Sequence, residues 1–181
     1  MKRLFLIAGL MTAFGLAVLA ASAAAPANFA GTWSLDKAKS QGLSQRMQGA
    51  DKVTWTITQD DKTISIDQKV EGGQPPAGGG GGGTGGGGGG GRPPAGPAAY
   101  NLDGSETTME MGQGKATLKA TWAASTLELV RKSTFNGPNG EVTSTNSQKL
   151  SLSGDGKVLT AVVHSESPRG TTDSTLVFNK Q

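Results

Sequence analysis

The chain has 181 residues, which is room for about one domain, and its formal net charge is +3. It has no cysteine and a single histidine, which excludes disulfides, a cysteine nucleophile, zinc–thiolate sites and multi-histidine metal sites. Its basic residues are scattered rather than clustered, so neither nucleic acid nor an anionic membrane surface is indicated as a partner.

The first 23 residues have the pattern of a secretory signal peptide. A basic start at Lys2 and Arg3 precedes an apolar run over residues 4–20. Ala21 and Ala23 fit the small-x-small rule, so cleavage is predicted after Ala23. The alternative is an uncleaved membrane anchor, because the run reaches the lower limit of about 17 residues for a spanning helix. Cleavage is the favoured interpretation, and it predicts a secreted or periplasmic protein with no stable membrane anchor.

Residues 28–36 predict the first strand of a single domain that spans residues 28–181. Every second position in this segment is apolar or glycine, which is the period of a strand. The positions in this phase are Phe29, Gly31, Trp33 and Leu35. The polar segment that follows, residues 36–50, has Leu43 and Met47 four positions apart and predicts a short helix or a loop.

Residues 53–70 predict a hairpin with one dry and one wet face. Large apolar residues alternate with threonines before a polar turn at residues 59–62, and isoleucines alternate with polar residues after it. Trp55 is on the dry face of this hairpin.

Residues 72–97 hold 16 glycines and 5 prolines and are predicted to be a disordered insertion between two strands. Such a segment loses much conformational entropy on ordering and buries no side chains. A sheet tolerates it because the cost of closing a loop grows only logarithmically with length. A phosphate-binding loop and an RNA-binding Arg/Gly segment are the alternatives. The first lacks its motif, and Arg92 is the only cation available to the second.

The second half of the chain predicts a succession of strands separated by short turns. The predicted strands lie at residues 98–102, 107–111, 116–122, 127–135, 142–152, 158–164 and 172–178. Because no convincing helix separates them, the sequence predicts an all-β antiparallel meander of about nine or ten strands. A sheet with that many twisted strands closes into a barrel or folds into a sandwich.

The opening FAGTWSL, residues 29–35, resembles the first-strand motif of the calycin superfamily, which includes the lipocalins and fatty-acid-binding proteins. The chain also resembles uncharacterised secreted bacterial proteins with the same F-x-G-x-W-x-L opening. The resemblance implies an up-and-down, lipocalin-like barrel that binds a small hydrophobic or amphipathic ligand. It also implies that Trp33 packs across the barrel floor beneath an arginine from near the C-terminus. Residues 172–178 contain no arginine, and the Arg-x-Tyr pair that grips fatty-acid carboxylates is absent.

Polar side chains share the apolar phase in the later predicted strands. Arg131 is in phase with Leu127 and Leu129, and Asn146 and Gln148 are in phase with Leu150. Because a buried charge is costly unless it is paired, an inward Arg131 needs a partner or a ligand. One interpretation is a ligand-binding wall. Its candidate residues are Arg131, Asn146, Gln148, Trp55 and Trp122.

Two other interpretations of Arg131 stay open. It forms a structural ion pair with an acid such as Glu110 or Glu166, or a β-bulge reverses the phase of its strand. His164, the only histidine, is interpreted as an ordinary strand residue rather than a ligand or a base.

No group of residues in the sequence has the spacing of a catalytic site, so the chain is predicted not to be an enzyme and to hold no metal or cofactor. Two functions remain. The first is a secreted or periplasmic carrier or sensor that binds a small hydrophobic or amphipathic molecule inside the barrel. The second is an envelope or surface interaction domain with a filled core. The packing of the barrel interior distinguishes them, and the sequence indicates no oligomeric state.

Overall fold

Ten strands and one short helix make up the part of the chain that the computed structural model describes, which is residues 26–72, 97–111, 114–137 and 140–181. The predicted signal peptide and nearly all of the Gly/Pro insertion lie outside the described residues. The first five strands are β1 (Gly31–Leu35), β2 (Lys52–Gln59), β3 (Thr63–Glu71), β4 (Ala99–Asn101) and β5 (Thr107–Glu110). The other five are β6 (Gly114–Ala123), β7 (Thr126–Gly137), β8 (Gly140–Leu152), β9 (Val158–Ser167) and β10 (Gly170–Lys180). The helix is α1 (Gln45–Gly49).

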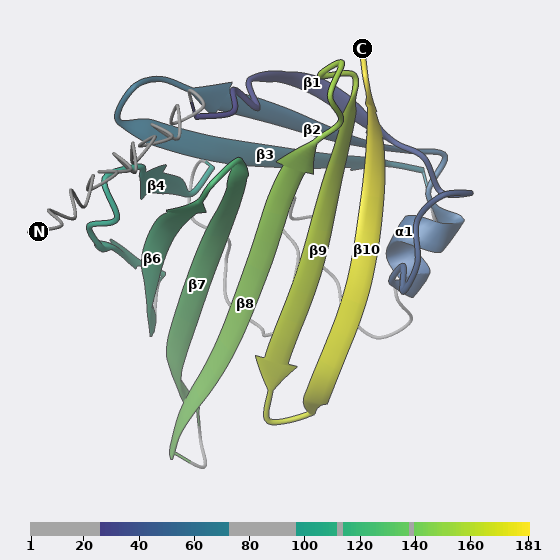
Figure 1. The fold of residues 1–181 in the computed structure, drawn as a ribbon. Helices are drawn as coiled ribbons and strands as arrows, with labels where there is room; N and C mark the ends of the chain where they lie inside the picture. Colours follow the sequence, from purple (N-terminus) through teal and green to yellow (C-terminus); the bar gives the residue numbers. More distant parts are fainter. Residues whose placement is uncertain (1–25, 73–96, 112–113, 138–139) are drawn as a thin grey trace, which may run out of the picture.

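All ten strands form one antiparallel sheet with the order β4-β3-β2-β1-β10-β9-β8-β7-β6-β5. Strands that follow one another in the sequence pair with each other, except for β4 and β5, which form the two ends of the sheet. In addition, β1 pairs with β10. β4 nevertheless lies against β5 and β6, so the sheet is a nearly closed barrel. In Figure 1, β1 to β3 cross over one end of the long strands β7 to β10. The predicted all-β meander is confirmed, and the open choice between barrel and sandwich is decided for the barrel.

The helix predicted within residues 36–50 occupies only Gln45–Gly49. Ser44 caps it by accepting a hydrogen bond from the Met47 amide at 3.4 Å. Lys37 donates to the carbonyls of Gln48 and Ala50 at its other end, where a cation is favourable. The residues before α1 are not helical because their backbone pairs with β10, through the bridge between Gln41 and Thr175.

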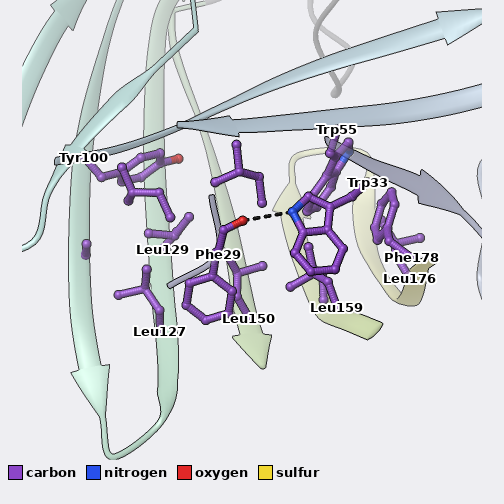
Figure 2. Close-up of a cluster of buried hydrophobic side chains, with 14 of the residues drawn as sticks. Phe29, Trp33, Trp55, Tyr100, Leu127, Leu129, Leu150, Leu159, Leu176 and Phe178 are labelled. Carbon is purple, nitrogen blue, oxygen red and sulfur yellow. Dashed lines mark hydrogen bonds between the residues drawn. The ribbon is translucent and has the colours of Figure 1, made fainter. Parts of the chain in front are cut away.

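Trp33 is fully buried at the centre of the core (Figure 2). Its Nε1 donates to the Phe29 carbonyl at 2.9 Å, and it lies opposite Trp55 of β2 and Lys180 of β10. The ammonium of Lys180 lies 5.2 Å from the centroid of the Trp33 ring, within the range of a cation–π contact. The cation over the tryptophan is therefore a lysine two positions beyond the predicted last strand, rather than the arginine that the calycin resemblance implies.

Gly31 is required for this arrangement. Its φ is +138°, which side chains rarely adopt, and a Cβ there would lie 3.2 Å from Cε of Lys180. The glycine of the Gly-x-Trp motif thus leaves room for the side chain that covers the tryptophan.

Replacing Trp33 with alanine is expected to lower the free energy of unfolding by ~3–5 kcal/mol, the range for deleting a large aromatic side chain from a core. Denaturant melts measure it. Trp122→Ala is the matched control, because Trp122 is only partly buried, and it is expected to cost less. Equal or negligible losses in both variants would contradict the central position of Trp33.

The register of β4 on β3 constrains the connection between them. Ala99 pairs with Ser65, whereas β3 continues for six more residues to Glu71. At about 3.3 Å per residue, the chain must return roughly 20 Å before β4 begins. A two-residue hairpin turn is therefore too short to replace the Gly/Pro insertion.

Replacing residues 73–96 with a ten-residue Gly/Ser linker is expected to leave the melting temperature within a few degrees of the wild-type value, because the insertion is predicted to bury nothing. Gly72 is kept, since a Cβ there would lie 2.0 Å from Oδ2 of Asp51. A large decrease in melting temperature would show that the insertion packs on the barrel.

Candidate ligand-binding site

The inner face of the barrel changes from apolar to polar over two successive rows of side chains in β7 to β10. The register places three successive rows of side chains across β7, β8, β9 and β10. The first row is Leu127, Leu150, Ala161 and Leu176, and all four side chains are buried. The second row is Leu129, Gln148, Val163 and Ser174, and the third is Arg131, Asn146, Ser165 and Thr172.

Solvent reaches the inner face from the third row onward. Thr172 is exposed although it shares the phase of buried Leu176 and Phe178. Val142, one of the two large exposed hydrophobic residues of the described chain, pairs with Phe135 in the same inward phase. The inner face is apolar at the end of the barrel that β1 to β3 cross (Figure 1), and its third row, nearer the far ends of β7 to β10, is polar. We call the first part the floor and the second part the mouth.

Arg131 lies at the boundary between floor and mouth and is partly buried. Its Nε donates to Oγ of buried Ser133 at 3.2 Å, and its Nη2 lies 2.9 Å from the sulfur of buried Met111. A thioether is a weak acceptor. Both partners are therefore neutral, and they accept only some of the five hydrogen bonds that the guanidinium can donate.

The two other interpretations of Arg131 are not met within the described residues. The pairing of β7 with β8 is continuous on both sides of Arg131, so no bulge reverses its phase. No ion pair joins it to Glu110 or Glu166 in this part of the chain. Glu110 is exposed, and Glu166 contacts His164 instead.

The other two predicted polar residues of the wall, Asn146 and Gln148, form a chain of hydrogen bonds with Ser165. Gln148 Nε2 donates to Asn146 Oδ1 at 3.0 Å, and Asn146 Nδ2 donates to Ser165 Oγ at 2.7 Å. Asn146 and Gln148 therefore bond to neighbouring side chains, whereas Arg131 has only its two contacts with neutral partners.

The two predicted tryptophans lie away from Arg131. Trp55 belongs to the filled floor, since it is 2% exposed and its ring lies 4.4 Å from that of Phe178. Its Nε1 donates to Gln68 Oε1 at 3.1 Å.

Trp122 stacks on Phe29, with 6.1 Å between the ring centroids, at the closed end of the barrel. It lines a pocket of about 430 Å³ there. The other residues that line it are Pro26, Asn28, Gln59, Asp60, Asp61 and Leu102.

Two residues that sequence reasoning missed lie near Arg131. Tyr100 of β4 is 7% exposed, and its hydroxyl makes no hydrogen bond with any described residue. Burial raises the pKa of Tyr100, and the nearby positive charge of Arg131 partly offsets this rise. Thr107 of β5 pairs with Leu118, which pairs with Arg131, so it continues the third row. Tyr100 is the only tyrosine of the chain, but the two strands are too short to show a phase.

His164 faces outward, beside exposed Val162, and is not part of the inner wall. Its Nδ1 lies 2.6 Å from Asp173 Oδ1, and its Nε2 lies 3.2 Å from Glu166 Oε1. The contact with Asp173 and, to a smaller extent, the contact with Glu166 raise the pKa of His164.

In the described ranges no cluster of side chains is suited to a metal ion. Across the same ranges, no helix has the length and hydrophobicity needed to span a bilayer.

The stability that His164 contributes is expected to depend on pH. Because its pKa is raised in the folded state, the contribution is complete below the unfolded pKa of about 6.5 and is lost as the pH rises through the folded value. Urea melts of the wild type and His164→Gln measure the difference in free energy of unfolding. It is expected to be largest near pH 6 and to shrink by about pH 9.

The Asp173→Asn background is the control, in which the pH dependence of the His164→Gln effect should be weaker. A difference that stays constant over this pH range would contradict the ion pairs of His164.

No family model matches the chain, and no curated protein matches it. Solved structures similar to it include the zebrafish ileal bile acid-binding protein complexed with cholic acid. The identity is 15% and the TM-score 0.46, with 84% of this chain and 98% of that chain covered. Another is the REP1-NXSQ fatty acid transporter, with 10% identity, a TM-score of 0.45, and 84% and 95% of the two chains covered. Similarity at this level does not bear on what this chain binds.

Proposed function

We propose that the barrel is a non-catalytic carrier or sensor that binds a small amphipathic molecule between its apolar floor and its polar mouth. The observation that carries this proposal is Arg131, which points inward at that boundary with only neutral partners in the described structure. An inward charge without an opposite charge costs free energy in the ligand-free protein. A ligand whose polar group contacts the guanidinium recovers that cost.

The filled floor restricts where the ligand binds. Trp55, Leu129 and Phe178 are each at most 2% exposed and belong to one buried cluster, in which the Trp55 ring packs on that of Phe178 (Figure 2). A ligand therefore occupies the space nearer the mouth, next to the second and third rows. This packing also favours the second candidate function, an envelope interaction domain with a filled core and no ligand.

A secreted or periplasmic location is part of the proposal, and the pattern of the first 23 residues supports it. Native mass spectrometry of the protein purified from its own host tests both parts. We expect a mass that corresponds to a chain beginning at Ala24, together with a bound molecule that dissociates at higher collision energy. A chain that retains its first 23 residues would contradict the location, and a ligand-free barrel would favour the second candidate.

Arg131→Met is expected to leave the free energy of unfolding of the ligand-free protein unchanged or higher, because methionine keeps the apolar stem and removes the buried charge. Its affinity for dodecanoate is expected to fall, whereas its affinity for dodecanol is expected to change little. Thermal melts and titration calorimetry measure the two effects. Lys132→Met, the exposed neighbour on the outer face, is the control.

A loss of roughly 3–5 kcal/mol in Arg131→Met would indicate that a buried acidic partner has been stranded. Combined with an unchanged response to dodecanoate, that loss would rule out a binding role for Arg131.

A further inference from the structure

Thr107 has a buried hydroxyl with nothing to bond. Its Oγ1 is the one side-chain polar atom that is buried without a hydrogen-bond partner among the described residues. Leaving a hydroxyl in this state costs the free energy of its desolvation, and such groups are rare in folded proteins. The Thr107 hydroxyl is therefore free to form a hydrogen bond with a further group.

Tyr100 and Arg131 lie in the same part of the barrel as Thr107, where β4 approaches β5 and β6. β4 and β5 are the two ends of the sheet, and β4 lies against β5 and β6 without pairing with either strand. Thr107 and Arg131 are two strands apart in one row, which is about 10 Å between backbones and within the reach of an arginine side chain. Tyr100 belongs to the buried core cluster and lies near Leu129 (Figure 2), and its hydroxyl makes no hydrogen bond with any described residue.

The chemistry of these three side chains defines what they bind. An arginine only donates hydrogen bonds, and the two hydroxyls each have a proton to donate, so the complementary group is rich in acceptors. One uncompensated positive charge matches one negative charge. The surrounding side chains, among them Leu118, Leu129 and Met111, are apolar and buried, and hydrogen bonds to a charged group are strong in such surroundings.

We propose that Tyr100, Thr107 and Arg131 form a head-group site for a singly charged anion at the seam between β4 and β5. This inference rests on the proposed function and assigns the ligand to the class of amphiphiles with a monoanionic oxygen group, such as a carboxylate or a sulfonate. The site uses three elements of the sheet, β4, β5 and β7, and therefore bridges its two unpaired ends.

A matched pair of fluorescent probes tests the proposal. The first is 8-anilinonaphthalene-1-sulfonate, a monoanion, and the second is N-phenyl-1-naphthylamine, which has the same aromatic body without the sulfonate. The variants are Thr107→Val and Tyr100→Phe, which remove one hydroxyl each and nearly preserve shape. Thr108→Val, on the opposite face of β5 and exposed, is the control.

Thr107→Val and Tyr100→Phe are each expected to raise the dissociation constant of the sulfonate probe about tenfold, as for loss of one hydrogen bond to a charged group. The dissociation constant of the neutral probe is expected to stay the same. The melting temperature of ligand-free Thr107→Val is expected to hold or rise, because an unsatisfied hydroxyl is removed. Opposite effects on stability and on anion affinity are the signature of a preformed binding group.

Equal weakening of both probes would show that the two hydroxyls act through structure, and unchanged affinity for the sulfonate probe would show that they do not contact the head group. Either result overturns the head-group site while leaving the barrel a binding protein. If the wild type binds neither probe, nor dodecanoate, the proposed function itself fails.

Discussion

The position of β1 between β2 and β10 holds the barrel together. This strand of five residues pairs with β2 on one side and with β10 on the other, so it joins the first four strands of the sheet to the last six. Trp33 lies at the centre of β1. Its side chain is fully buried in the floor of the barrel, and the ammonium of Lys180 lies over its ring. Without these contacts, the two parts of the sheet would share only the weak approach of β4 to β5 and β6.

Closure at β1 determines the character of the interior. Because β1 to β3 cross only one end of the long strands (Figure 1), the inner rows that they cover are apolar and filled. The third row is polar, and Arg131 belongs to it. The same closure leaves β4 and β5 as the two ends of the sheet. Tyr100 lies on β4, and Thr107, whose buried hydroxyl has no partner among the described residues, lies on β5.

Much of this organisation could be predicted from the sequence because a period of two reports directly on the face of a strand. It predicted the meander, the buried phase of Trp55 and Leu129, and the inward direction of Arg131. What it could not predict depends on pairing between distant segments. Lys180 covers Trp33 because β10 continues beyond the predicted strand. Trp122 lies away from Arg131 because it pairs with Leu127 and stacks on Phe29 at the closed end of the barrel. β4 and β5 have three and four residues, too few for a period, so Tyr100 and Thr107 gave no signal.

The central claim is that an amphipathic ligand contacts Arg131 inside the barrel. The mature chain is predicted to contain only four arginines, Arg46, Arg92, Arg131 and Arg169, so their side-chain N–H resonances can be assigned one by one by substitution. A titration with dodecanoate followed by NMR tests the claim directly. The Nε–H resonance of Arg131 is predicted to shift and saturate with the ligand while those of Arg46 and Arg169 stay in place. Saturable binding that leaves the Arg131 resonance unmoved would contradict the account.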